Sequence, residues 1–292
     1  MKLWMIPEKE AVVEAQPEPT QEPITVPSVD EVSRNLIFCY DAETNIISKM
    51  VLEVFHCGRK QLTYITIPTE TQFTMSDILY RQLIAVQPSI PQMLRLSAMT
   101  RYLDASVVFD YGELMAEDML GLEISYYTVM PVELYQTIFE EKSISAGITA
   151  ADILEGSYDT SDKQAAQVAE DKQEGSPVAQ DAVPEDKQVD SPAETEQKSN
   201  PVVAQVFTKD YIKTIDKLDS AEQISTYIEE LYSTLQSNLP VVQKMNYLES
   251  YNKTSLADVS FTRLAGFDKN SGFVMDQALV QQQLQELGVF DK

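Results

Sequence analysis

Three strand-like segments that follow one another closely constrain the fold of this chain more than any other feature. Residues 36–40, 49–56 and 61–67 are rich in Val, Ile, Tyr, Phe and Thr, which fit a pleated, half-buried surface. Only short polar joins separate them, so we expect consecutive strands of one sheet. Pro68 follows the third segment and indicates that the chain leaves the sheet there.

Helical patterns follow these strands. Residues 74–86 carry apolar side chains at helical spacing, with Thr74 or Ser76 as the N-cap. Residues 92–103 fit either a helix or a partly helical crossover, and residues 105–120 fit a further helix.

A strand at 122–130 and a helix at 132–141 come next. Strand, helices, strand and helix in this order are typical of layered α/β domains. We therefore predict an α/β fold, a three-layer α-β-α sandwich around a mixed β-sheet.

The C-terminal part continues the same alternation. Residues 220–235 form the clearest helix pattern, with Ser220 and Gln223 spaced as a capping box. The other expected elements are a short strand or turn at 147–154, strands at 202–207 and 257–264, a short helix or turn at 212–218, and helices at 241–251 and 276–287.

Two regions lack this patterning. Residues 1–34 are rich in Pro and Glu and predict an extended linker. Residues 156–200 are acidic, and a Glu-Asp-Lys-Gln unit recurs within them, which predicts a disordered insertion. The domain is then made of two parts, residues 35–155 and 201–292.

Composition excludes several classes of function. Acidic residues outnumber basic ones 46 to 22, and the net charge of −24 disfavours nucleic-acid binding. A single histidine and two cysteines make the usual zinc sites improbable. Cys39 and Cys57 could pair, but free buried thiols are the favoured reading.

The chain shows no signal peptide and no apolar run long enough to span a bilayer. The first six residues, MKLWMI, fit the remnant of a membrane segment lost upstream or an ordinary start. A membrane attachment would therefore need a segment upstream of this chain.

Short motifs stand in a distinctive order along the chain. They are Tyr40–Asp41 at the end of the first strand, Ser48–Lys49 at the start of the second, residues 66–71 (TIPTET) after the third, residues 95–98 (RLSA), and residues 119–121 (MLG) before 124–129 (ISYYTV). This order resembles the LytR–CpsA–Psr family of bacterial cell-envelope proteins, over residues 35–154 and 201–287.

The resemblance implies a function outside the membrane. The family transfers glycopolymers from undecaprenyl-pyrophosphate carriers to peptidoglycan, which needs arginines, a divalent ion and an apolar tunnel for the lipid. The departures fall on the charged groups: Lys49 stands in place of an aspartate, Thr69 in place of an arginine and Glu70 in place of an aspartate. The family's later Arg-x-Arg segment has no counterpart.

Five residues are the candidates for ligand binding: Asp41, Glu70, Arg81, Arg95 and Arg101. The arginines could form a new anion site, although solvated charges on helix faces are the simpler reading. No catalytic residue and no metal ligand is assigned, and Mg²⁺ is expected only if the chain is active.

The favoured hypothesis is a catalytically degenerate protein on the extracytoplasmic face of a bacterial envelope. It would keep the scaffold and a groove for a polyprenyl lipid or glycan, with a polyprenyl-linked glycan or peptidoglycan as partner. The alternatives are an active phosphotransferase that joins such glycopolymers to peptidoglycan, and an acidic interaction adaptor that acts through the repeat insertion.

Overall fold

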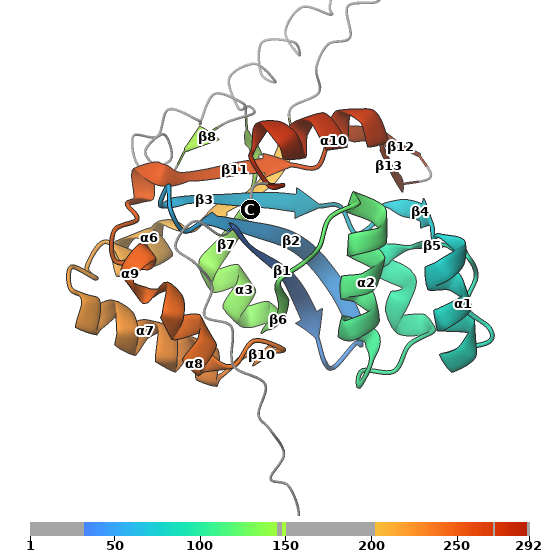
Figure 1. Ribbon diagram of the computed structural model, residues 1–292, viewed down its shortest axis with the longest axis horizontal. Coiled ribbons are helices and arrows are strands. Elements are labelled where there is room, and N and C mark those ends of the chain that lie inside the picture. The colour runs from blue at the N-terminus through green and yellow to red at the C-terminus, as the bar shows by residue number, and fades with distance from the viewer. Residues whose placement is uncertain (1–31, 145–147, 150–201, 271, 291–292) are drawn as a thin grey trace, which may run out of the picture.

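A seven-stranded mixed sheet organises the chain (Figure 1). The computed structural model describes residues 32–144, 148–149, 202–270 and 272–290. The predicted insertion at 156–200, and all but the last three residues of the predicted linker at 1–34, lie outside this part of the chain.

The order of the strands across the sheet is β10, β6, β1, β2, β3, β11, β8. Their bounds are β1 Val32–Asp41, β2 Ile46–His56, β3 Gln61–Ile67, β6 Tyr126–Pro131, β8 Ile148–Thr149, β10 Gln236–Ser237 and β11 Val259–Arg263. Strands β1, β2 and β3 are antiparallel neighbours, whereas β6 is parallel to β1 and β11 is parallel to β3. The predicted mixed sheet is confirmed.

Alternate side chains of each central strand enter different layers, as the two-residue period of a strand requires. On β1, Leu36 and Phe38 join one apolar cluster, and Ile37 and Cys39 join the other. Two packed faces make a sandwich of three layers, and the predicted fold class is confirmed.

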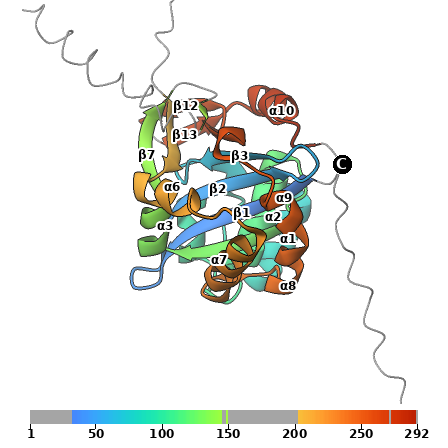
Figure 2. The same cartoon turned by 90° about the vertical axis from the view of Figure 1, so that its left-hand side faces the viewer.

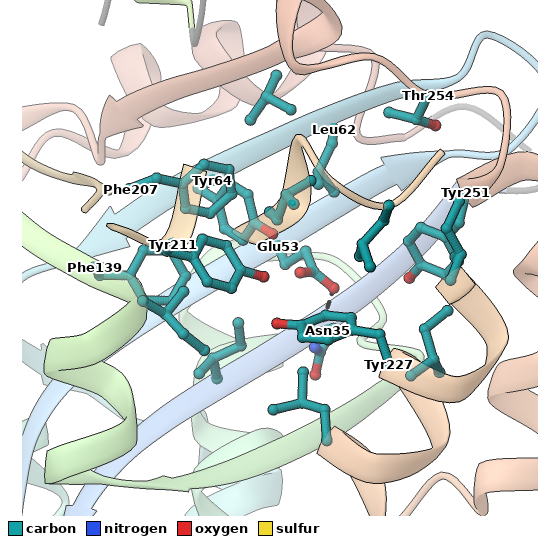
Figure 3. Close-up of a pocket in the computed structure, with 18 of the residues that line it drawn as sticks. Asn35, Glu53, Leu62, Tyr64, Phe139, Phe207, Tyr211, Tyr227, Tyr251 and Thr254 are labelled. Atoms are coloured by element: carbon teal, nitrogen blue, oxygen red, sulfur yellow. Dashed lines mark hydrogen bonds between the residues drawn. The ribbon is translucent and has the colours of Figure 1, made fainter. Parts of the chain in front are cut away.

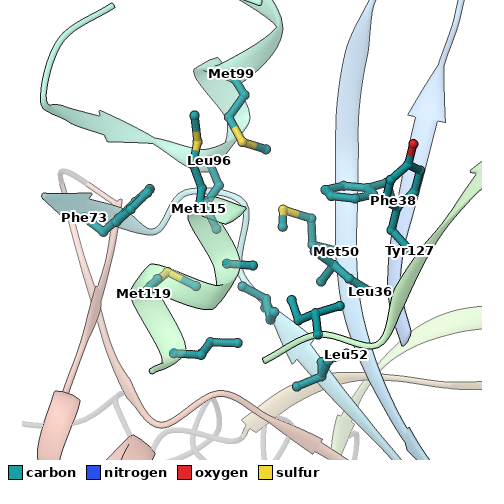
Figure 4. Packing of buried hydrophobic residues seen from close by; sticks show 14 of the residues in the cluster. Leu36, Phe38, Met50, Leu52, Phe73, Leu96, Met99, Met115, Met119 and Tyr127 are labelled. Atoms are coloured by element: carbon teal, nitrogen blue, oxygen red, sulfur yellow. The ribbon is translucent and has the colours of Figure 1, made fainter. Parts of the chain in front are cut away.

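The first face is covered by α1 (Asp77–Val86), the 3-10 helix η1 (Leu96–Arg101), α2 (Val108–Leu120) and α10 (Gln277–Glu286). Figure 4 shows its core, where Met99 and Met115 approach Phe38 and Met50. All four side chains are fully buried. This face is closely packed.

The second face is covered by α3 (Val132–Ile138), β7 (Phe139–Ile144), β9 (Val202–Phe207), α6 (Lys209–Ile215), α7 (Ala221–Ser233), α8 (Val241–Lys244) and α9 (Leu248–Tyr251). In the side view, the central strands lie between α3 and α6 on one side and α1 and α2 on the other (Figure 2). The apolar cluster on this face includes Phe139, Phe207 and Phe261.

Several sequence predictions need correction. Of the two alternatives for residues 92–103, the full helix is wrong and the partly helical crossover is confirmed: the short strand β5 (Met93–Arg95), which pairs with β4 (Gln72–Thr74), is followed by η1. The helix predicted to reach residue 141 ends at Ile138, because the chain turns there into β7 and pairs with β9. The hairpin of β12 (Gly266–Lys269) and β13 (Gly272–Met275) was not predicted.

The helix caps follow the sequence closely. Ser76 rather than Thr74 caps α1, because its hydroxyl accepts from the Leu79 amide at 3.3 Å. Ser220 accepts from the Gln223 amide at 3.2 Å, as predicted. The Gln223 side chain, however, accepts from the amide of Asp219 and not from that of Ser220.

Both cysteines are buried, and neither forms a disulfide. Burial raises the pKa of the Cys39 thiol, and the Ser48 hydroxyl donates to its sulfur at 3.1 Å. The favoured reading of two free thiols is confirmed.

Candidate functional site

The ends of β1, β2 and β3 carry the sequence-predicted site, and we call this region the strand-end edge (Asp41, Lys49, Glu70 and Arg95). Asp41 closes the turn between β1 and β2. Its Oδ1 accepts from the Glu43 and Thr44 amides at 2.9 and 3.2 Å, and its Oδ2 accepts from the Thr44 hydroxyl at 2.7 Å. The hydrogen bond from the Thr44 hydroxyl is the main cause that lowers the pKa of this exposed carboxyl.

Lys49 lies where the family resemblance implies an aspartate. Its Nζ is 3.0 Å from Glu141 Oε2, on β7. Both side chains are partly exposed. A lysine cation paired with the Glu141 carboxylate therefore stands where the resemblance implies an aspartate.

Glu70 and Arg95 meet across the loop that follows β3. Arg95 Nη1 lies 3.3 Å from Glu70 Oε2. The β12–β13 hairpin is hydrogen-bonded to this loop, since the Phe273 amide donates to the Glu70 carbonyl at 3.3 Å. Gly272 adopts φ +123° there, and a Cβ would lie 2.7 Å from the same carbonyl oxygen.

The other two candidate arginines lie on exposed surface. Arg81 is exposed on α1, and Arg101 is exposed near the end of η1. The η1 segment is tied to the β1–β2 turn, because the Asn45 amide side chain donates to the Thr100 carbonyl at 3.3 Å. The structure thus brings Glu70 and Arg95 together, and Arg81 and Arg101 face solvent.

The strand-end edge does not fit a divalent cation. Asp41 accepts three hydrogen bonds within its own turn, and a lysine paired with Glu141 stands where the family resemblance implies a second carboxylate. In the described ranges, no three His, Cys, Asp or Glu side chains gather as a metal site would need.

A cavity of about 420 Å³ lies on the second face of the sheet, and no sequence motif located it (Figure 3). This volume falls within the range of small-molecule sites, roughly 300–1,000 Å³. Much of its wall is apolar and includes Leu62, Phe139 and Phe207. The only sequence signal was the apolar stripe of α7, which faces this space.

The α7 stripe shows why the cavity remains open. The cavity is lined by Ile224, Tyr227, Ile228 and Leu231 of α7 and by Leu235 just after the helix, yet Ile228 is the only buried residue of α7. A stripe of this kind normally packs against a core. Here the stripe forms one wall of the cavity.

The floor of the cavity is polar. The Asn35 amide donates to Glu53 Oε1 at 3.2 Å, and the Thr128 hydroxyl donates to Asn35 Oδ1 at 3.0 Å. Lys244 Nζ lies 3.8 Å from the same Glu53 oxygen and donates to the Tyr126 hydroxyl. Lys244 is only 2% exposed, so this is a buried ion pair.

Four tyrosine rings surround the Lys244 ammonium. Its Nζ lies 4.9 Å from the ring centroids of Tyr126 and Tyr232, 5.1 Å from that of Tyr251 and 5.9 Å from that of Tyr247. Burial alone would lower the pKa of Lys244, but the tyrosine oxygens and Glu53 raise it well above its ordinary value. Lys244 is therefore a cation, and the rings stabilise it.

No family model matches the sequence, and no curated protein matches it either. Solved structures do match. The Streptococcus agalactiae protein gbs0355 has a TM-score of 0.51 at 11% identity, over 90% of this chain and 89% of its own. B. subtilis TagV has a TM-score of 0.47 at 10% identity, over 88% and 97%. TagT bound to LI-WTA has a TM-score of 0.45 at 14% identity, over 91% and 94%.

The chain thus has a mixed α/β fold of a kind found in solved bacterial proteins. The likeness of fold rests on gbs0355. TagV and TagT, also among the matching structures, belong to the LytR–CpsA–Psr family that the sequence motifs resemble. No helix in the described ranges has the length and apolarity to span a bilayer.

Proposed function

We propose that this chain is a catalytically degenerate protein of the LytR–CpsA–Psr fold that acts at the bacterial cell envelope. It binds a polyprenyl-linked glycan or peptidoglycan without transferring the glycopolymer. The observation that carries the proposal is the pairing at the strand-end edge, where Lys49 is bonded to Glu141 and Arg95 to Glu70.

The chemistry of transfer explains why this pairing matters. A pyrophosphate leaving group carries developing negative charge, and each missing donor costs on the order of 3 kcal/mol of transition-state stabilisation. The Lys49 and Arg95 cations already have carboxylate partners, so each pair has no net charge. An anion that approaches either pair therefore meets no net positive charge.

The cavity supports the binding half of the proposal. It lies between the sheet and α7, and its apolar walls could take the lipid part of a ligand. The neighbouring protein TagT has been solved bound to LI-WTA and to LIIa-WTA. For this chain, the partner class and the extracytoplasmic location rest on the order of the sequence motifs.

A transfer assay tests the proposal directly. The chain is incubated with a lipid-pyrophosphate glycan, Mg²⁺ and peptidoglycan, and product and bound lipid are both measured. We expect binding without transfer. Transfer that Asp41→Asn abolishes would overturn the proposal. The Asn oxygen can still accept from the Glu43 and Thr44 amides, while the negative charge and the acceptor for the Thr44 hydroxyl are lost.

A further inference from the structure

We propose that the cavity on the second face selects a neutral amphipath whose hydroxyl group lies between Glu53 and Lys244. The proposal rests on the function proposed above, since it names the polar group that the cavity would accept. Fatty alcohols, polyprenols and the sugar hydroxyls of a polyprenyl-linked glycan share this chemistry, whereas lipid phosphates and carboxylates lack it. The pyrophosphate of such a glycan would therefore lie outside the cavity.

The distance between the two charged groups favours a bridging hydroxyl. The Lys244 ammonium and the Glu53 carboxylate are 3.8 Å apart, beyond hydrogen-bond length but within reach of one oxygen placed between them. An ammonium has three donors, and a carboxylate has about four acceptor sites. Lys244 already bonds the Tyr126 and Tyr251 hydroxyls, and Glu53 already bonds the Asn35 amide and the Tyr64 hydroxyl. A hydroxyl both donates and accepts, so it can use the remaining capacity of both groups at once.

The balance of charge at the floor excludes a charged ligand. One cation and one anion meet there, and each is mostly buried, with side-chain exposures of 3% for Lys244 and 13% for Glu53. An additional buried charge would lack a partner, which is expensive. A carboxylate ligand would lie beside Glu53, and an amine would lie beside Lys244.

The other titratable groups that face the cavity do not change this balance. Burial is the main cause that raises the pKa values of Tyr64, Tyr211, Tyr227 and Tyr251, which stay neutral. Asp216 also lines the cavity, but it is exposed to solvent. The charges at the floor therefore sum to zero.

The walls determine where the apolar body would lie. Leu62, Phe139 and Phe207 are buried, and Figure 3 shows Phe139 and Phe207 on the side away from Tyr251. Half-buried Leu218 and Ile224 also line the space, from α7 and the loop before it. A chain between these residues can place its hydroxyl on the polar floor.

Three probes of equal chain length test the head group: 1-decanol, decanoate and decylammonium. Each is titrated against the full chain with bound N-phenyl-1-naphthylamine, and the loss of its fluorescence gives the affinity. We expect 1-decanol to bind at least about tenfold more tightly than either ion, in line with the cost of a buried unpaired charge. No uptake, or a preference for decanoate, would overturn the proposal.

Two variants test the head-group preference itself, because each should change the ranking of the three probes and not only their affinities. Glu53→Gln leaves the Lys244 cation unbalanced and should shift the preference towards decanoate. Lys244→Met leaves the Glu53 anion unbalanced and should shift it towards decylammonium. Glu249→Gln is the control, because Glu249 pairs with Lys253 on the exposed face of α9. An unchanged ranking in both variants would contradict a hydroxyl at this place.

The outcome also separates this proposal from the proposed function. If 1-decanol binds with the expected ranking but the lipid-linked glycan does not, the hydroxyl site stands and the proposed function fails. If the glycan binds and all three probes rank equally, the head-group assignment fails and the proposed function stands.

Discussion

The strand-end edge and the cavity floor both hold paired charges, but they differ in exposure. At the edge, the Lys49 and Glu141 side chains are 38% and 54% exposed, whereas at the floor Lys244 is 3% exposed. Water and salt screen the first pair, and neither reaches the second freely. Breaking the buried ion pair should therefore change the free energy of unfolding more than breaking the exposed one.

The largest expected effect is the loss of the buried cation. Lys244→Met removes one partner of the floor pair and leaves Glu53 without its counter-charge. We expect the free energy of unfolding to fall by about 3 kcal/mol, which urea denaturation would measure. The double variant with Glu53→Gln should recover part of the loss, and a single variant as stable as the native chain would break the comparison.

The second prediction compares two helix leucines. Leu83 on α1 is fully buried in the packed face, and Leu231 on α7 lines the cavity and is half-buried. We expect Leu83→Ala to lower the free energy of unfolding by about 3 kcal/mol and Leu231→Ala by about 1 kcal/mol or less. Equal losses would show that the cavity wall is packed as tightly as the first face.

A carboxyl of intermediate burial should give an intermediate effect. Burial is the largest cause that raises the pKa of Glu113 to about 6, while the Asn238 amide donates to its Oε2 at 3.2 Å. Because the folded-state pKa is raised, stability should fall as the pH rises from about 4.5 to 6. We expect Glu113→Gln to flatten this slope and to add about 1 kcal/mol at pH 7, after allowance for partial exposure. Urea denaturation across this pH range checks it, and an unchanged slope would contradict it.

The smallest effect is expected at the strand-end edge. Lys49→Met breaks the exposed pair with Glu141 and should change the free energy of unfolding by about 0.5 kcal/mol or less. A double-mutant cycle with Glu141→Gln measures the coupling. A coupling above about 1 kcal/mol would show that the edge pair is far less screened than its exposure indicates.

Sequence patterns predicted the elements that depend on local spacing. The β-branched and aromatic residues of 61–67 predicted β3, and the stripe of residues 220–235 predicted α7. The use of that stripe could not be predicted, because the cavity also needs β9 and α9 to arrive from elsewhere in the sequence. Strand β7 was missed since its sequence, FEEKSI, is largely polar and its partner β9 lies far along the chain.

The same limit applies to the candidate site. Asp41 and Glu70 stand at strand ends as their motifs predict, but their roles depend on partners. Lys49 meets Glu141 because β7 reaches the sheet from residue 139 onward, and no spacing near residue 49 contains that contact. A charged side chain with no partner nearby in the sequence can still pair with a residue of a distant strand.

Binding of inorganic pyrophosphate tests most directly whether the strand-end edge has lost its phosphate chemistry. Calorimetric titration of the full chain, with Mg²⁺ present, should detect no association tighter than about 1 mM, and Lys49→Met should give the same result. Micromolar binding that Lys49→Met or an Arg95→Gln variant abolishes would contradict the account, because it would show that Glu141 and Glu70 yield their cations to an incoming phosphate.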